Sequence, residues 1–129
     1  MKVNAIFRAS LISILYISLV ACANVGMQRI GQSSYPPLSD NENVFVFTSD
    51  DQIKDQYEVI GIISYNNPGK YQVLTLESAI EPLKEKARQL GANAIIIDKS
   101  QPVKSGIIST GMYVEARAIR IGSNSKKYW

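Results

Sequence analysis

Residues 83–96, LKEKARQLGANAII, decide the fold, because they hold the end of an amphipathic helix and the start of a buried strand. The helix is predicted by an apolar stripe with spacings of 4, 3, 4 and 3, formed by Leu76, Ile80, Leu83, Ala87 and Leu90. Gly91 is predicted to end the helix in the left-handed conformation. The apolar run of residues 94–97 does not alternate, which predicts a strand covered on both faces, with the helix on one of them. The cover of the other face stays open, and a partner chain is one option.

The start of the helix has two interpretations. Ser78 and Glu81 have capping-box spacing, which predicts a start near Ser78. Pro82 then lies in or just after the first turn, where its missing N–H costs least. If the helix instead starts near Thr75, Pro82 is expected to kink it.

Three further strands are predicted from β-branched and aromatic runs, at residues 44–48, 57–65 and 112–121. Residues 99–109 are predicted to form a loop. The order is β-β-α-β-β, so we expect an α+β fold: a single small domain over residues 44–122. It would have one antiparallel or mixed sheet with one helix packed on one face.

Residues 22–43 are predicted to be a flexible linker that starts at Cys22, and residues 123–129 a C-terminal tail. The linker stretch is rich in Gly, Ser, Pro and polar residues and lacks sustained periodicity. In the alternative interpretation, Tyr35 and Leu38 pack along the edge of the domain.

Residues 1–21 have the pattern of an exported leader. Lys2 and Arg8 give residues 1–8 a positive charge, and residues 9–21 are almost wholly apolar. This order is typical of a secretory signal peptide. The apolar run is shorter than the roughly 20 residues that a transmembrane helix needs, although a signal anchor that stays in the chain is the alternative.

The apolar run ends in Leu19, Val20, Ala21 and Cys22, which resemble the lipobox of bacterial lipoproteins at all four positions. The resemblance implies a diacylglycerol on the Cys22 sulfur, cleavage after Ala21, and an N-acyl chain such as palmitate on the new amino group. We expect this covalent lipid and no other cofactor. Ala23, in place of the aspartate that retains lipoproteins in the inner membrane, resembles the default signal for the outer membrane. The alternative is an ordinary leader that leaves a free thiol.

Composition excludes several classes of site. The 129-residue chain has no histidine and Cys22 is its only cysteine, which excludes Cys-His pairs, His-dependent triads, zinc clusters and structural disulfides. The net charge of +3 falls to +1 without Lys2 and Arg8, and the remaining charges are well mixed. A nucleic-acid partner is therefore not expected, because it would need a basic stripe.

Other polar groupings have structural and functional interpretations. Asp50, Asp51 and Asp55 are expected to lie in a solvated turn, since they lack the rhythm of a calcium loop. Glu115 and Arg117 share one face of a strand, as an ion pair or as a polar anchor for a ligand. The tyrosines are expected near one end of the sheet, where they finish the core edge or form a contact surface: Tyr57, Tyr65, Tyr71 and Tyr113.

The helix ending A-x-x-L-G-A-N-A before an aliphatic strand resembles an element of the YbjQ-like and Rcs stress-sensor lipoprotein group. Residues 60–63 and 118–120 fit as well, so the resemblance covers roughly residues 44–121. Gly91, Ala92 and Asn93 are then architectural: Gly91 turns the chain, Ala92 allows tight packing, and Asn93 bridges backbone groups. Ring-forming relatives make a homo-oligomer one option. The domain lacks the ligands for soft-metal binding and the disulfides of the stress sensor.

These observations favour a non-enzymatic lipoprotein of the cell envelope, anchored to the membrane by its lipid. Its small periplasmic domain is expected to bind a protein partner. An envelope-stress signalling lipoprotein is the alternative. An envelope hydrolase that uses Ser105, beside Lys104, or a carboxylate is the third hypothesis.

Overall fold

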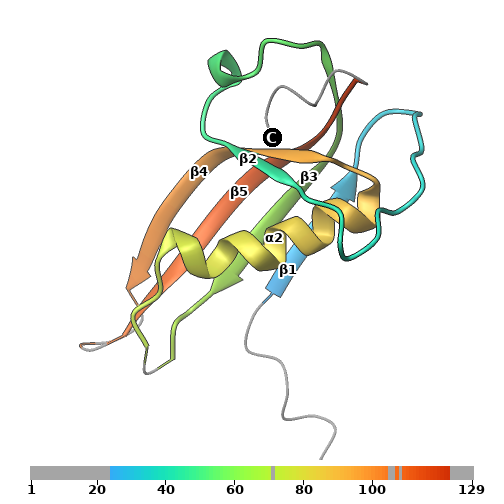
Figure 1. The fold of residues 1–129 in the computed structure, drawn as a ribbon. Coiled ribbons are helices and arrows are strands. Elements are labelled where there is room, and N and C mark those ends of the chain that lie inside the picture. The colour runs from blue at the N-terminus through green and yellow to red at the C-terminus, as the bar shows by residue number, and fades with distance from the viewer. Residues whose placement is uncertain (1–23, 71, 105–106, 108, 123–129) are drawn as a thin grey trace, which may run out of the picture.

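A computed structural model describes residues 24–70, 72–104, 107 and 109–122. They fold into a five-stranded mixed sheet with one α-helix across one face (Figure 1). The strand order is β1-β3-β5-β4-β2; β2 runs parallel to β4, and the other neighbours are antiparallel. The predicted α+β class, with one helix on a mixed sheet, is confirmed. The elements are β1 (Asn24–Arg29), β2 (Phe45–Phe47), the 3-10 turn η1 (Asp50–Gln52), β3 (Tyr57–Asn67), α2 (Leu76–Leu90), β4 (Ala94–Lys104) and β5 (Thr110–Ile121).

The linker prediction does not hold for residues 24–29, because they form the edge strand β1. This strand pairs antiparallel with β3, from Asn24 opposite Asn66 to Arg29 opposite Gly61. Val25 is the one apolar side chain of β1 that packs against the core, and it is only partly buried. The sequence of β1 shows no alternation because its hydrogen bonds to β3, rather than its side chains, hold it in place.

The chain after β1 also packs on the domain, as the alternative interpretation had it. Tyr35 is partly buried against the core, and the Leu38 N–H donates to the Arg88 carbonyl at the end of α2 over 2.8 Å. The compact fold therefore begins at Asn24 and not at Val44.

Helix α2 starts one turn earlier than Ser78. Thr75 is the N-cap, and its N–H donates to the Ser78 Oγ over 3.3 Å in a capping box. Pro82 therefore lies inside the helix, where it cannot donate to the Ser78 carbonyl. The buried stripe of Ala79, Leu83, Ala87 and Leu90 faces the sheet, and Gly91 ends the helix with a φ of 81°.

Strand β4 continues to Lys104, so the predicted loop at residues 99–104 is wrong. Beyond a bulge between Ile97 and Lys99, β4 pairs with β5 as far as Lys104 opposite Thr110. Strand β2 pairs only with residues 94–96 of β4, so the outer part of β4 is an edge. Pro102 is tolerated there because an edge strand needs no donor on its outer side.

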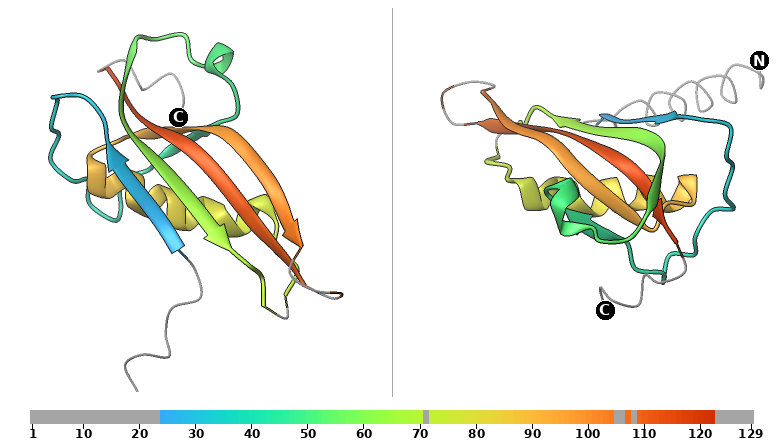
Figure 2. Two further views of the ribbon diagram at one scale, coloured as in Figure 1. Left: turned by 180° about the vertical axis from the view of Figure 1, so that it is seen from behind. Right: turned by 90° about the horizontal axis from the view of Figure 1, so that it is seen from above.

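Both faces of the start of β4 are covered, as its apolar run predicted. Ile95 and Ile97 point toward α2, whereas Ala94 and Ile96 lie in a second cluster. Phe47 and Ile53 close that second cluster. The face of β4 that points away from α2 is therefore covered by the chain's own segment around η1. Figure 2 shows this segment over one end of the sheet, with the rest of that face open.

Candidate functional site

A groove of about 570 Å³ lies at the end of the sheet where β3 begins and β5 ends. We call it the Arg120 groove. It is lined by Tyr35, Gln56, Tyr57, Glu58, Asn93, Arg120, Ile121 and Gly122. Sequence reasoning singled out Asn93 for an architectural role, and Tyr35 and Tyr57 as residues of an edge or contact surface. It did not bring them together, because the walls come from four separate segments of the chain.

Three side chains in the groove are held by contacts to one another and to the backbone. Glu58 and Arg120 are cross-strand partners in β3 and β5. The Tyr35 hydroxyl donates to the Glu58 Oε2 over 2.6 Å, and the Arg120 guanidinium lies 5.3 Å from the centre of the Tyr35 ring. Arg120 Nη1 also donates to the Gly91 carbonyl over 3.0 Å. The guanidinium is thus oriented by two partners, Tyr35 in the segment between β1 and β2 and Gly91 at the end of α2.

The charges of the groove follow from these bonds. Hydrogen bonds from Ser33 and then from Tyr35 lower the pKa of Glu58, because they stabilise its charged form. The bond to Glu58 raises the pKa of Tyr35, since that bond needs the phenolic proton. The pKa of Tyr57 is raised as well, by its hydrogen bond to Asp50, so at neutral pH the groove presents one carboxylate, one guanidinium and two neutral phenols.

Asn93 does bridge backbone groups. Its Nδ2 donates to the Ile121 carbonyl over 3.0 Å, and its Oδ1 accepts from the Ile121 N–H over 2.8 Å. Its own N–H donates to the Ile119 carbonyl over 3.1 Å. The amide thus extends the pairing with β5 by one residue before the start of β4, and it forms one wall of the groove.

Gly91 and Ala92 also have architectural surroundings. A Cβ on Gly91 would lie 2.6 Å from the Tyr35 Cβ and 2.7 Å from the Pro36 carbonyl oxygen. Ala92 is fully buried in the core beside α2. The glycine therefore serves both the left-handed turn and the close passage of the 35–36 segment.

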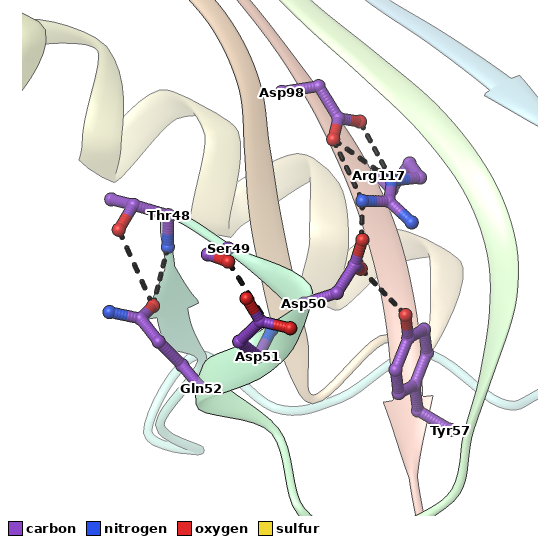
Figure 3. Close-up of polar contacts among 8 residues, drawn as sticks. All are labelled: Thr48, Ser49, Asp50, Asp51, Gln52, Tyr57, Asp98 and Arg117. Atoms are coloured by element: carbon purple, nitrogen blue, oxygen red, sulfur yellow. Dashed lines mark hydrogen bonds and ion pairs between the residues drawn. The ribbon is translucent and has the colours of Figure 1, made fainter.

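A second polar cluster, centred on Arg117, lies on the sheet face opposite α2 (Figure 3). Arg117 Nε donates to both oxygens of Asp98 over 2.8 and 3.1 Å, and its Nη2 donates to the Asp50 Oδ1 over 2.9 Å. The Tyr57 hydroxyl donates to the same Asp50 oxygen over 2.7 Å. The cluster joins β4, β5, β3 and η1, so it fastens the η1 segment onto the sheet.

The pKa shifts in this cluster favour the charged forms of Asp50 and Arg117, which hold η1 on the sheet. The hydrogen bond from Tyr57, followed by the contact with Arg117, lowers the pKa of Asp50. The bond to Asp50 raises the pKa of Tyr57, and Asp98 raises the pKa of Arg117. Asp50 is thus an ionised partner of Arg117, and its role is structural. Among the described residues no group of three or more His, Cys, Asp or Glu side chains is placed to hold a metal ion.

Glu115 does not pair with Arg117, although the two share one face of β5 as predicted. Glu115 accepts a hydrogen bond from the Tyr113 hydroxyl over 2.9 Å, and the Lys99 ammonium lies 5.7 Å from the Tyr113 ring centre. The bulge at Ile97–Lys99 brings Asp98 to Arg117 instead. Sequence spacing cannot reveal this exchange of partners.

The predicted gathering of tyrosines at one end of the sheet holds for Tyr65 and Tyr113 but not for Tyr57. Tyr57 and Tyr65 lie near opposite ends of β3, and they belong to clusters on opposite faces of the sheet. Tyr113 lies opposite Asn66, at the end of the sheet away from Tyr57. Tyr71 lies outside the described residues.

Two further predicted sites also fall outside the described part of the chain. They are the lipobox, residues 19–22, and Ser105 of the hydrolase hypothesis. Within the described ranges, no helix combines the length and the apolar character that a membrane crossing requires.

The Arg120 groove is suited to binding. Its lining side chains supply a guanidinium, two amides, a carboxylate and phenols, but no thiol, imidazole, amine or aliphatic hydroxyl. A polar segment with both donors and acceptors matches the groove.

No family model and no curated protein matches the sequence. The fold is similar to the crystal structure of a Francisella virulence factor, FvfA, with 13% sequence identity and a TM-score of 0.47. The similarity covers 74% of this chain and 96% of that chain. At this level it carries no information on function.

Proposed function

We propose that this chain is a lipoprotein of the bacterial cell envelope, anchored through Cys22, whose domain binds a protein partner without catalysing a reaction. The observation that carries the proposal is the lipobox of residues 19–22 at the end of an apolar leader. A diacylglycerol plus an N-acyl chain gives a durable anchor, whereas a single chain holds a protein only reversibly. Ala23 favours the outer membrane, with the domain facing the periplasm.

The position of β1 supports this arrangement. β1 begins at Asn24, two positions after Cys22, and two residues reach at most about 7 Å. An anchor at Cys22 would therefore hold one end of the sheet close to the bilayer. A lipid on Cys22 would then have no long tether between it and the fold.

The Arg120 groove lies toward the other end of the same sheet. Asn24 is opposite Asn66 in β3, whereas Glu58 of the groove lies eight positions earlier in that strand. At about 3.3 Å per residue, the two ends are about 26 Å apart along β3. The anchor would present the groove away from the membrane, where a periplasmic partner can reach it.

The anchor is tested by labelling cells with a fatty-acid probe and separating the two membranes. Wild-type protein should carry the label in the outer membrane, and a Cys22→Ala variant should carry none. Ala23→Asp is the matched control, since it keeps the label and should move the protein to the inner membrane. Unlabelled wild-type protein would refute the proposal.

The binding role is tested with a photo-crosslinking amino acid in place of Gln56, in the groove. The same group in place of Glu77, on the exposed face of α2, is the control. We expect a discrete crosslinked envelope protein from the groove position only, and its loss when Arg120→Gln is added. A crosslink of equal yield at both positions, or one that ignores Arg120, would contradict a role for the groove.

A further inference from the structure

The end of the sheet near Asn24 carries exposed apolar side chains beside lysines. Val73 is 70% exposed and Ile107 is fully exposed, and they are the two most exposed large apolar side chains of the described residues. Lys70 and Lys104 are exposed at the same end. A solvent-facing pair of this kind has no role in the core of the fold.

Backbone pairing holds this surface together. Val73 bridges to Thr110 at the start of β5, and Thr110 is opposite Lys104 in β4. The Leu74 N–H donates to the Thr110 carbonyl over 2.8 Å, and the Thr110 N–H donates to the Gln72 carbonyl over 3.0 Å. Residues 72–74 and the paired ends of β4 and β5 therefore form one ledge.

The ledge lies at the anchored end of the molecule. Asn24 is opposite Asn66 in β3, and Asn67 is opposite Met112 in β5. Figures 1 and 2 show the start of β1, the end of β3, the end of β4 and the start of β5 at one end of the sheet. A lipid on Cys22 would reach the bilayer within about 7 Å of this end.

We propose that Lys70, Val73, Lys104 and Ile107 form a basal surface that rests on the anionic headgroups of the anchoring membrane. The inference rests on the proposed lipidation of Cys22. Val73 and Ile107 enter the headgroup layer, while the two lysines bind phosphates through flexible stems. The contact holds the sheet upright. Arg120 follows Thr110 by ten positions in β5, so at about 3.3 Å per residue the Arg120 groove is held about 33 Å from the ledge.

The test measures amine labelling of single lysines by mass spectrometry. The full chain, purified from envelope membranes, is compared in detergent and in vesicles of phosphatidylethanolamine with phosphatidylglycerol. Labelling of Lys70 and Lys104 should slow by about fivefold or more in vesicles, the factor that about 1 kcal/mol per lysine at an anionic surface gives. Lys54, beyond η1 at the other end, should keep its rate.

Variants separate a specific contact from mere tethering. The double variant Val73→Ser, Ile107→Ser should restore the labelling rates, whereas the matched pair Val46→Ser, Ile62→Ser, also at exposed apolar positions, should not. Equal protection in wild type and in the first pair would overturn the proposal. Protection that persists in neutral vesicles and rises with protein density would also overturn it, because a second copy would then cover the surface.

The same sample distinguishes this proposal from the proposed function. Mass spectrometry of the N-terminal peptide shows whether Cys22 is acylated, and an unmodified peptide refutes the lipoprotein proposal alone. In that case Cys22, the only cysteine, is coupled to a maleimide lipid in the vesicles, and the labelling is repeated. Absence of protection in the coupled chain then refutes the basal surface.

Discussion

Replacing Gly91 with alanine should destabilise the fold more than the loss of a helix cap explains. Gly91 has a φ of 81°, and the left-handed conformation costs a residue with a Cβ about 1–2 kcal/mol. The new Cβ would lie 2.6 Å from the Tyr35 Cβ and 2.7 Å from the Pro36 carbonyl oxygen. Overpacking of this kind costs about 1–3 kcal/mol more. The expected loss is therefore about 2–5 kcal/mol, a large part of the stability of a small domain.

The matched control is Gly31→Ala. Gly31 has a φ of 78°, but a Cβ there would have no atom within 4 Å. It reports the backbone cost alone, about 1–2 kcal/mol. Urea unfolding of both variants, followed by far-ultraviolet circular dichroism, gives the two losses of unfolding free energy on one scale.

The difference between the variants measures how firmly the 35–36 segment is held. Tyr35 carries the hydrogen bond to Glu58 and the contact with Arg120, so a displaced segment should also open the Arg120 groove. If Gly91→Ala and Gly31→Ala agree within about 0.5 kcal/mol, the segment yields freely and the steric argument is refuted.

Three further predictions concern the sheet, the core and the acid limit of stability. Asn93→Ala removes both hydrogen bonds to the Ile121 backbone and should lower the free energy of unfolding in urea by about 1–3 kcal/mol. A loss below about 0.5 kcal/mol would show that water replaces the amide. Leu83→Ala opens a cavity at a fully buried site and should cost about 2–5 kcal/mol, against almost nothing for exposed Glu77→Ala. Because the pKa of Asp50 is lower in the folded state, ionised Asp50 stabilises the fold at pH values above its unfolded pKa. This stabilisation is lost as the pH falls through the folded pKa. In Asp50→Asn, the free energy of unfolding should therefore fall less steeply as the pH drops below about 4. Urea unfolding measured from about pH 6 to about pH 2 checks this, and a pH dependence equal to that of the wild type would contradict the role given to Asp50.

The helix and the buried strands could be predicted because their own side chains specify them. The buried residues of α2 and of positions 94–97 are apolar and follow a regular spacing, so the sequence shows directly which side chains are buried. β1 was missed because its partner strand, not its side chains, supplies its stabilising bonds. The extension of β4 was missed because polar residues and Pro102 are compatible with an exposed edge.

The Arg120 groove was missed for a different reason. Tyr35 and Glu58 are 23 residues apart in the chain, and Arg120 comes from the last strand. None of these residues has a motif around it that predicts the others. The one usable signal was the option that Tyr35 packs on the domain edge.

The sequence by itself determined the helix with its glycine stop, the strand buried on both faces and the absence of histidine or paired cysteines. These follow from local periodicity and composition, which need no knowledge of distant segments. Only the tertiary structure decided that residues 24–29 complete the sheet, that η1 is the second cover, that Arg117 pairs with Asp98 and Asp50, and that a groove forms around Arg120. Those features depend on backbone pairing and on side chains brought together from separate strands, and such contacts leave no period in the sequence.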